Sequence, residues 1–431
     1  MKRILFAGCV ILLPLAVPVL CAAEDAIDDL GERLSASALG DSLRGQLSGT
    51  LDLEGYAAGQ PSPGFLRTEG DTTLFVPRLS VFLDAQLGPA FYVFAQSRLD
   101  RGFDPGYGGS LRPQLDEYVI RFTPSEKGAF DLQIGKFATI VGNWTQRHDS
   151  WNNPFITAPL PYDNLTGIWD AIALRSTRTL LEWAQITPSS SFAMDSGKNL
   201  RLPILWGPSY TAGAAVSGEL GWLQYAVEIK NAALSSRPET WSPTQTQWDT
   251  PAFSARIAVS PDERWKLGLS GSEGPYLRQS AVSTLPPGRP LSTYREIVLG
   301  EDVSFAWHHF QAWAEMYEAR FEIPAVANAD TLAYYLEAKV KLTPQFSWAL
   351  RWNQQLYGTV FVPQFVSSGG SLPPVPAHRS AWGRDLWRMD AAPAYRLTAH
   401  IQLKLQASIE EGDADSRGVI GMLATQLTVR F

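Results

Sequence analysis

The chain has 431 residues, 36 basic and 43 acidic side chains, and a formal net charge of -7. This balance excludes a protein that binds nucleic acid through a basic surface. Both cysteines, Cys9 and Cys21, lie near the amino terminus. The rest of the chain therefore excludes a disulfide framework, a thiolate zinc site, covalent haem attachment and a cysteine nucleophile, and we expect no metal and no cofactor.

The first residues predict a secretory signal peptide. Lys2 and Arg3 precede an apolar run from Ile4 to Leu20, and small residues follow at 21–23. This is the layout of a peptide that is cleaved after Ala22 or Ala23. Removing residues 1–23 takes away two basic residues and no acidic ones, which moves the net charge from -7 to -9.

Two alternatives to cleavage are weaker. A membrane anchor would need an unbroken apolar run of ~20 residues, whereas Pro14 and Pro18 interrupt this one. A lipoprotein would carry its acyl chain on Cys21, but the bulky Leu20 stands where such sites usually have a small residue.

Residues 24–42 form an acidic segment that precedes the main domain. It contains apolar Ile27, Leu30 and Leu34, whose spacing predicts a short helix or a loose tail.

From residue 43 to residue 431 the chain reads as one domain of alternating segments. In 400–410, for example, Leu403 and Leu405 are apolar while Lys404 and Gln406 are polar. A period of two places alternate side chains on opposite faces of a strand. We predict eighteen strands, at 43–57, 76–87, 90–100, 114–123, 129–138, 168–176, 179–187, 209–218, 221–231, 252–260, 264–273, 293–307, 309–320, 331–343, 346–357, 386–398, 400–410 and 418–431.

The connections between these segments alternate in length. Short turns of a few residues are followed by long links at 58–75, 101–113, 139–167, 188–208, 232–251, 274–292, 321–330, 358–385 and 411–417. Short turns on one side and long loops on the other are typical of membrane-spanning barrels. An even number of strands returns the final residue to the side on which the first strand begins.

The last strand is the most regular. Leu427, Val429 and Phe431 alternate with polar residues up to the end of the chain. We therefore predict a transmembrane antiparallel β-barrel of eighteen strands, with sixteen as the alternative, which is closed by this strand. A soluble sandwich or propeller would also alternate, but the chain has no repeat of ~40–50 residues that would mark propeller blades.

Charged residues of both signs fall on the predicted inward face. Most of them would solvate a wet lumen and pair across strands. We expect the pore to be lined by Arg78, Arg98, Glu117, Arg121, Asp131, Arg256, Lys339, Arg351 and Lys404.

The longest link, 139–167, is the third long loop. Aromatic faces beside amide and carboxylate groups suit a sugar-like or other polar organic solute, and a loop folded inward would narrow the pore. The alternative is an exterior loop packed on its own aromatic and proline residues. The candidate constriction residues are Trp144, Arg147, His148, Asp149, Trp151, Asn152, Tyr162 and Asp163.

The predicted signal, the strand end Gly135-Lys136-Phe137 before a long third loop, the alternating connections and Phe431 together resemble the bacterial outer-membrane porin superfamily. The resemblance implies a barrel, often trimeric, that passes small hydrophilic solutes such as sugars or organic anions by passive diffusion, with the third loop folded inward. It also implies export through the periplasm, contact with outer-membrane lipids, and insertion by the barrel assembly machinery through the strand that ends at Phe431.

Two other function classes stay open. A non-transport barrel would act as an adhesin or a scaffold. A barrel enzyme would need a catalytic constellation, and His148-Asp149 is the one histidine–carboxylate pair in a plausible pocket. The sequence has no Gly-x-Ser-x-Gly motif, and we expect no enzyme activity.

Overall fold

The computed structural model describes most of the chain. The described residues are 24–38, 42–59, 64–66, 71–100, 111–125, 128–184, 201–238, 248–364, 375–412 and 419–431. The predicted signal peptide, 1–23, lies outside them. No helix in these ranges combines the length and the apolar character that crossing a membrane would require.

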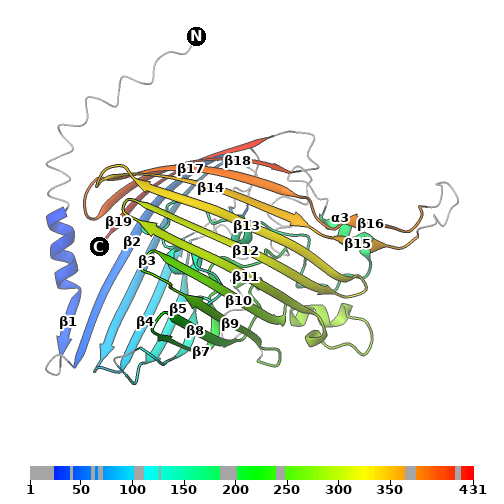
Figure 1. Ribbon diagram of the computed structural model, residues 1–431, viewed down its shortest axis with the longest axis horizontal. Coiled ribbons are helices and arrows are strands. Elements are labelled where there is room, and N and C mark those ends of the chain that lie inside the picture. The colour runs from blue at the N-terminus through cyan, green and yellow to red at the C-terminus, as the bar shows by residue number, and fades with distance from the viewer. Residues whose placement is uncertain are drawn as a thin grey trace, which may run out of the picture.

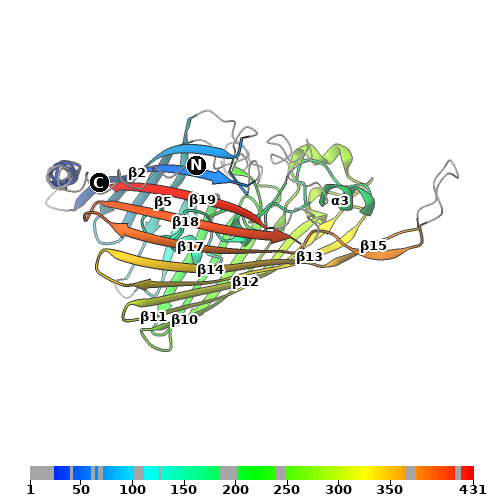
Figure 2. The same cartoon turned by 90° about the horizontal axis from the view of Figure 1, so that it is seen from above.

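Sixteen antiparallel strands form a closed barrel (Figure 1, Figure 2). Each strand pairs with the next along the chain, and β19 pairs with β2 to close the ring. Eighteen strands is therefore wrong, and the alternative of sixteen is confirmed. The barrel strands are β2 (Leu43–Ala58), β3 (Thr73–Leu87), β4 (Phe91–Asp100), β5 (Arg112–Phe122), β6 (Asp131–Phe137), β7 (Thr211–Leu220), β8 (Leu223–Lys230), β9 (Ala252–Val259), β10 (Trp265–Pro275), β11 (Arg295–Trp307), β12 (Phe310–Ile323), β13 (Ala327–Lys341), β14 (Phe346–Tyr357), β17 (Leu386–Arg396), β18 (Ile401–Gly412) and β19 (Ile420–Arg430).

Two predicted strands, 168–176 and 179–187, fall instead in the connection between β6 and β7, and residues 185–187 of the second lie outside the described residues. In the first segment the described structure has a single isolated bridge, Trp169 to Arg201. The second begins in helix α3 (Thr177–Ala184). Leu174 and Leu180 are buried in a core inside the barrel mouth. These two leucines are therefore packed inside the protein rather than facing lipid.

The predicted link 321–330 is also mostly strand. β12 continues to Ile323 and β13 begins at Ala327, so that three residues make the turn. Ala325 and Ala327 both have positive φ angles, as tight turns require. At this hairpin the prediction of a long loop was wrong.

The alternation of faces follows the expected pattern. On β18 the side chains of Gln402, Lys404 and Gln406 are buried in the barrel interior, whereas Leu403 and Leu405 are exposed on the outside. An apolar outer face and a polar inner face are what a barrel in lipid requires.

Aromatic side chains form a band on the outer face near the short turns. Trp222 and Trp307 are more than half exposed, and Trp265 stacks near Phe305 with 4.5 Å between ring centroids. Rings of this kind favour the boundary between lipid and water. The short turns lie at one end of the barrel with the C-terminus and the helix of residues 24–33, while α3 and the hairpin of β15 (Thr359–Val362) with β16 (His378–Ala381) lie at the other (Figure 1).

The first described residues complete the barrel seam. After the helix of residues 24–33, strand β1 (Ser35–Ala38) pairs with the start of β2. Phe431 exchanges two 3.0 Å backbone hydrogen bonds with Gly49, and Leu47 then donates to the carbonyl of Leu34 at 3.0 Å. β1 therefore lies beside β2 where β19 has ended.

One sector of the inner face is apolar. This differs from the sequence-based prediction of a charged lumen. At the loop end, β12 and β13 turn aromatic and aliphatic side chains inward, among them Tyr317, Phe321 and Tyr335. The β6–β7 loop covers this sector with Trp144 and Tyr162. Protein side chains therefore fill this sector of the interior.

Candidate functional site

The connection between β6 and β7 comprises residues 138–210, of which 138–184 and 201–210 are described, and its first part lies across the barrel interior. We call it loop 3. Its first part contains two short helices, η1 (Trp144–Arg147) and α2 (Leu160–Asp163). This part contacts inward-facing side chains of β12, β13, β14, β17 and β18, as the following contacts show. It starts at residue 138, one residue before the predicted start, and it extends well beyond 167, because the two segments predicted to be strands fall within it.

Glu315 on β12 anchors the start of the loop. Its carboxylate accepts hydrogen bonds from the backbone N–H of Asn143, the backbone N–H of Trp144 at 2.8 Å and the hydroxyl of Tyr162 at 2.7 Å. The N–H groups at the start of a helical turn have no partner within the turn, so a buried carboxylate satisfies them. Gly142 precedes this contact with φ +78°, and an added Cβ would collide with the hydroxyl of Tyr317.

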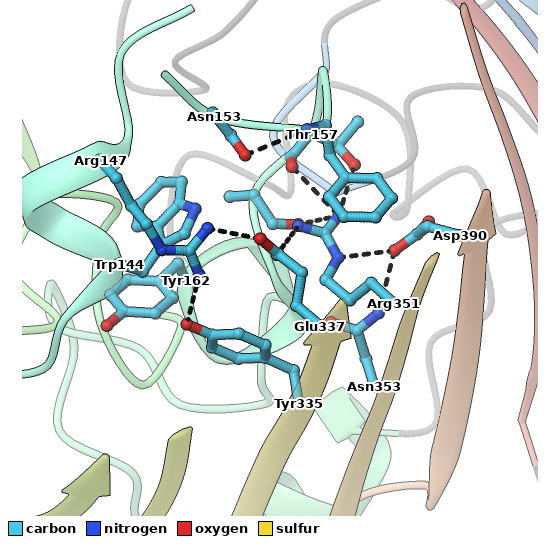
Figure 3. Close-up of polar contacts among 12 residues, drawn as sticks. Trp144, Arg147, Asn153, Thr157, Tyr162, Tyr335, Glu337, Arg351, Asn353 and Asp390 are labelled. Atoms are coloured by element: carbon cyan, nitrogen blue, oxygen red, sulfur yellow. Dashed lines mark hydrogen bonds and ion pairs between the residues drawn. The ribbon is translucent and has the colours of Figure 1, made fainter. Parts of the chain in front are cut away.

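Arg147 attaches the same turn to β13. Its guanidinium pairs with Glu337 at 2.5 Å and donates to the hydroxyl of Tyr335 at 3.0 Å (Figure 3). It also lies over the ring of Trp313, 4.3 Å from the centroid. A planar guanidinium between a carboxylate and an aromatic face is held in one orientation.

A second guanidinium, Arg351 on β14, holds the middle of the loop. It pairs with Asp390 on β17 at 2.8 Å and donates to the carbonyl of Thr157 at 3.1 Å (Figure 3). The ring of Phe155 covers it at 4.2 Å. Asn353 donates to the same Asp390 carboxylate at 3.0 Å. Both charges are buried, and their partners compensate the loss of water.

Strand β18 provides two further contacts. Lys404 donates to the carbonyls of Ser150 and Asn153, the latter at 2.8 Å. The side-chain oxygen of Gln406 accepts from the backbone of Ile156 at 2.7 Å. Contacts from β12 round to β18 therefore hold residues 143–163 against one wall.

A cavity of about 230 Å³ lies between loop 3 and the wall of β2, β3 and β4. Its lining mixes both charges with aromatic rings. The lining includes Asp52, Phe65, Arg78, Phe82, Arg98, Asp116, Trp144, His148, Asp149, Tyr162, Asp163, Trp206, Tyr210, Arg388 and Glu410.

The cations on the β2–β5 wall are paired. Arg78 contacts Glu54 at 3.3 Å and Asp100 at 3.1 Å, and Arg98 contacts Asp100 and Asp116, each at 2.8 Å. On the opposite side, Arg388 pairs with Asp163 of the loop at 2.9 Å. A solute in the cavity therefore meets both hydrogen-bond donors and acceptors, rather than a surface with charges of a single sign.

His148 does not pair with Asp149. Its Nδ1 lies 2.5 Å from the carbonyl oxygen of Thr145, and its Nε2 lies 2.5 Å from the hydroxyl of Tyr210. The Asp149 carboxylate accepts instead from Asn152, at 2.8 Å from Nδ2. Burial lowers the pKa of His148 below its ordinary value, so the imidazole is neutral at pH 7.

The predicted constriction residues occupy different places. Five of them line the cavity: Trp144, His148, Asp149, Tyr162 and Asp163. Arg147 is engaged with Glu337, and Asn152 is exposed. Trp151 lies under Arg396 and Arg430, with 5.3 and 4.4 Å from each guanidinium to its ring centroid.

The predicted pore-lining residues divide in the same way. Arg78 and Arg98 line the cavity. Three are held by other contacts: Arg256 pairs with Asp302, Arg351 with Asp390, and Lys404 binds loop carbonyls. The side chains of Glu117, Arg121, Asp131 and Lys339 are not among the residues that line it.

Sequence reasoning missed Glu315, Arg388 and Asp390, which lie on the inner face. Regular alternation on β12 and β17 could have identified them. Asp116 was hidden for a different reason. The register between β4 and β5 shifts at Gln96/Ser97, so that an irregularity breaks the period of two there. Within the described ranges, no group of three or more histidine, cysteine, aspartate or glutamate side chains could hold a metal ion.

No family model matches the sequence, and no curated protein matches it. Solved structures do match in fold. An OmpT variant of Vibrio cholerae that lacks loop L8 has a TM-score of 0.53 at 8% identity, over 91% of this chain and 100% of that one. An anion-selective porin from Comamonas acidovorans has a TM-score of 0.52 at 10% identity, over 90% and 100%.

The outer membrane channel DcaP of Acinetobacter baumannii has a TM-score of 0.51 at 9% identity, over 92% of this chain and 99% of that one. At such low identities these matches show that the chain has the fold of the outer-membrane porins and channels. They say nothing of its solute.

Proposed function

We propose that the protein is an outer-membrane channel through which small hydrophilic solutes diffuse passively. The observation that supports this most directly is the charged and aromatic cavity inside a barrel with an apolar outer face. A wet, polar interior lets hydrated solutes enter without shedding all of their water, while the outer face suits lipid. The shared fold of known porins and channels agrees with this function.

Loop 3 forms the narrowest part of this channel. Trp144, His148, Asp149, Tyr162 and Asp163 would contact the solute from the loop side, and Arg78 and Arg98 from the wall. Aromatic faces and paired charges favour solutes that combine a hydrophobic face with hydrogen-bonding groups, such as sugars or organic anions.

The same proposal includes the route to the membrane. Residues 1–23 direct export through the periplasm, and the strand that ends at Phe431 is presented to the barrel assembly machinery. The end with the short turns then faces the periplasm and the end with the long loops faces outward. We also propose a homotrimer, because one structural neighbour is an OmpT of Vibrio cholerae described in a trimer form.

An adhesin or scaffold barrel is the second candidate. It is favoured by the extent to which loop 3 fills the barrel, since a scaffold needs no open path. An enzyme is not proposed, because His148 and Asp149 are engaged with different partners and do not form an acid–base pair.

The deciding experiment is reconstitution of residues 24–431 in a planar bilayer. Stepwise conductance above the background of protein-free bilayers is expected. Insertion without any conductance step would reject the channel and favour the adhesin or scaffold, for which binding of labelled surface ligands to intact cells is the next measurement.

A further inference from the structure

Four cations gather on the inner face at the turn end of the barrel. They are Lys339 and Lys341 on β13, Arg396 on β17 and Arg430 on β19, and we call them the basic exit cluster. On β13 the two lysines follow the inward-facing Glu337 at intervals of two residues. Arg396 follows Ala394, and Arg430 follows the buried Thr428, at the same interval.

Trp151 of loop 3 brings the two arginines together. The guanidinium carbon of Arg430 lies 4.4 Å from the centre of its ring, and that of Arg396 lies 5.3 Å from it. Lys339 is within electrostatic range of Lys341, Arg396 and Arg147, so the lysines belong to the same group of charges. The indole is almost fully buried, at 7% exposed. It lies against two guanidinium groups, for which the described part of the chain has no ion-pair partner.

Two carboxylates in this part of the barrel, Glu337 and Asp149, are engaged by other groups. Glu337 contacts Arg147 at 2.5 Å and Arg351 at 3.7 Å. Asp149 accepts from the backbone of Trp151 and from Asn152. Among the residues that the structure describes, none of the four cations has a carboxylate within ion-pairing distance. The cluster therefore has an excess of positive charge.

The surroundings of the cluster raise the electrostatic potential that its charges produce in the lumen. Lys341, Arg396 and Arg430 are exposed to the lumen, whereas the barrel wall behind them is apolar. A low-dielectric wall around a group of like charges focuses their field into the aqueous opening. A guanidinium offers paired N–H donors whose spacing matches the two oxygens of a carboxylate.

We propose that the basic exit cluster is a binding site for small organic carboxylates at the periplasmic end of the channel, and that it makes the channel prefer anions. This inference rests on the proposed channel function and names the class of solute. A carboxylate that has passed the mixed-charge cavity meets Arg396 and Arg430 beside Trp151 and leaves from there.

The test uses the double variant Arg396→Gln/Arg430→Gln and the control Lys266→Gln. The control removes one positive charge near the same end of the barrel, on β10, which lies on the far side of the ring from β19. In a potassium chloride gradient, we expect the reversal potential of the wild-type channel to indicate anion preference. In the double variant the reversal potential should shift toward cation preference. In the control it should stay close to the wild-type value.

Succinate then tests the ligand. We expect succinate to reduce the chloride current of the wild type and of Lys266→Gln, and the double variant to need at least tenfold more succinate. Equal block in wild type and double variant would overturn the proposal. Block by inorganic phosphate without block by succinate would also overturn it, because the site would then belong to phosphate.

Isothermal titration of succinate into the detergent-solubilised barrel separates this inference from the channel proposal. Heat of binding in the wild type that the double variant lacks would support the site even in a barrel that does not conduct. If the protein does not conduct, only the channel proposal is rejected. If it shows neither succinate binding nor anion preference, the basic exit cluster is rejected as a binding site.

Discussion

At the scale of single residues, Glu315 holds the start of loop 3 against β12. Glu315→Ala would leave the backbone N–H groups of Asn143 and Trp144 and the Tyr162 hydroxyl without their acceptor. Hydrogen bonds to a charged group contribute about 1.5–3 kcal/mol each, so we expect docking of the loop to weaken by about 3 kcal/mol or more. Single-channel conductance should rise and fluctuate, and loop 3 should be cut faster by a protease.

Glu318→Gln is the matched control, because this side chain lies on the same strand but is exposed on the outer face. It should leave conductance and proteolysis unchanged. If Glu315→Ala conducts like the wild type while its loop is cut faster, loop 3 does not set the width of the pore.

His148 gives a pH dependence whose sign follows from its burial. Because its pKa is lowered in the folded protein, the unfolded chain binds a proton more readily near pH 6. The free energy of unfolding should therefore fall as the pH drops below the ordinary histidine pKa of about 6.5, by up to about 1.4 kcal/mol per pH unit. Urea unfolding at a series of pH values should show a smaller decrease for His148→Gln.

The control for this measurement is His378→Gln, at an exposed position of β16. It should retain the full wild-type pH dependence. If His148→Gln retains it as well, protonation of His148 is not coupled to unfolding.

Alternation along a strand predicts which face a side chain lies on, but not which residues it contacts. Alternation places Arg78 and Arg98 on the inner face, and the structure puts both at the cavity. The alternation does not predict that Arg351 is buried against Phe155 and Asp390. This burial depends on the position of a loop that is distant in the sequence. Adjacency suggested a pair for His148 and Asp149, although neighbouring residues rarely point toward each other.

At the scale of elements, the long third loop was predicted but its extent was not. The segments 168–176 and 179–187 have the apolar content of strands, and a period of two over a few residues does not distinguish a lipid-facing strand from a loop packed on a core. Here the apolar inner face of β12 and β13 provides that core. The structure therefore has two strands fewer and a longer loop.

The amino-terminal segment is an element whose removal can be tested. β1 adds backbone pairing to β2 over Leu43–Gln46, and the helix before it contacts the β17–β18 turn through Asp28 and His400 at 2.9 Å. Backbone hydrogen bonds contribute about 0.5–1.5 kcal/mol each. Deleting residues 24–38 should lower stability by about 1–3 kcal/mol, seen as a lower temperature of barrel unfolding on a detergent gel, and should leave conductance unchanged.

Asp28→Asn tests the smaller contact alone. A single hydrogen bond to an exposed carboxylate contributes little, so the variant should behave nearly like the wild type. If the deletion also has no effect on unfolding, β1 does not stabilise the seam.

At the scale of the whole molecule, the architecture could be predicted because it rests on local signals. Each barrel strand must hide its backbone polar groups and expose apolar side chains to lipid, so a period of two marks nearly every one of them. Closure of the ring was predicted from the terminal strand, and β19 does pair with β2. What fills the barrel depends on contacts between residues far apart in the chain, such as Glu315 with Asn143, and these have no local signal.

Closure of the ring can be tested at the glycines of β2. A Cβ at Gly49 would lie 2.5 Å from Cζ of the Phe431 ring and 2.7 Å from the carbonyl oxygen of Ser80, closer than real contacts allow. Gly49→Ala should therefore displace the terminal residue, break its paired hydrogen bonds to β2, and destabilise the barrel by about 1–3 kcal/mol. At Gly45 the nearest atom would be 3.9 Å away, so Gly45→Ala is the matched control.

The measurement is the temperature at which the barrel unfolds on a detergent gel. We expect this temperature to fall for Gly49→Ala and for deletion of Phe431, and to stay unchanged for Gly45→Ala. Equal behaviour of the two alanine variants would mean that the end of the chain does not hold the barrel closed.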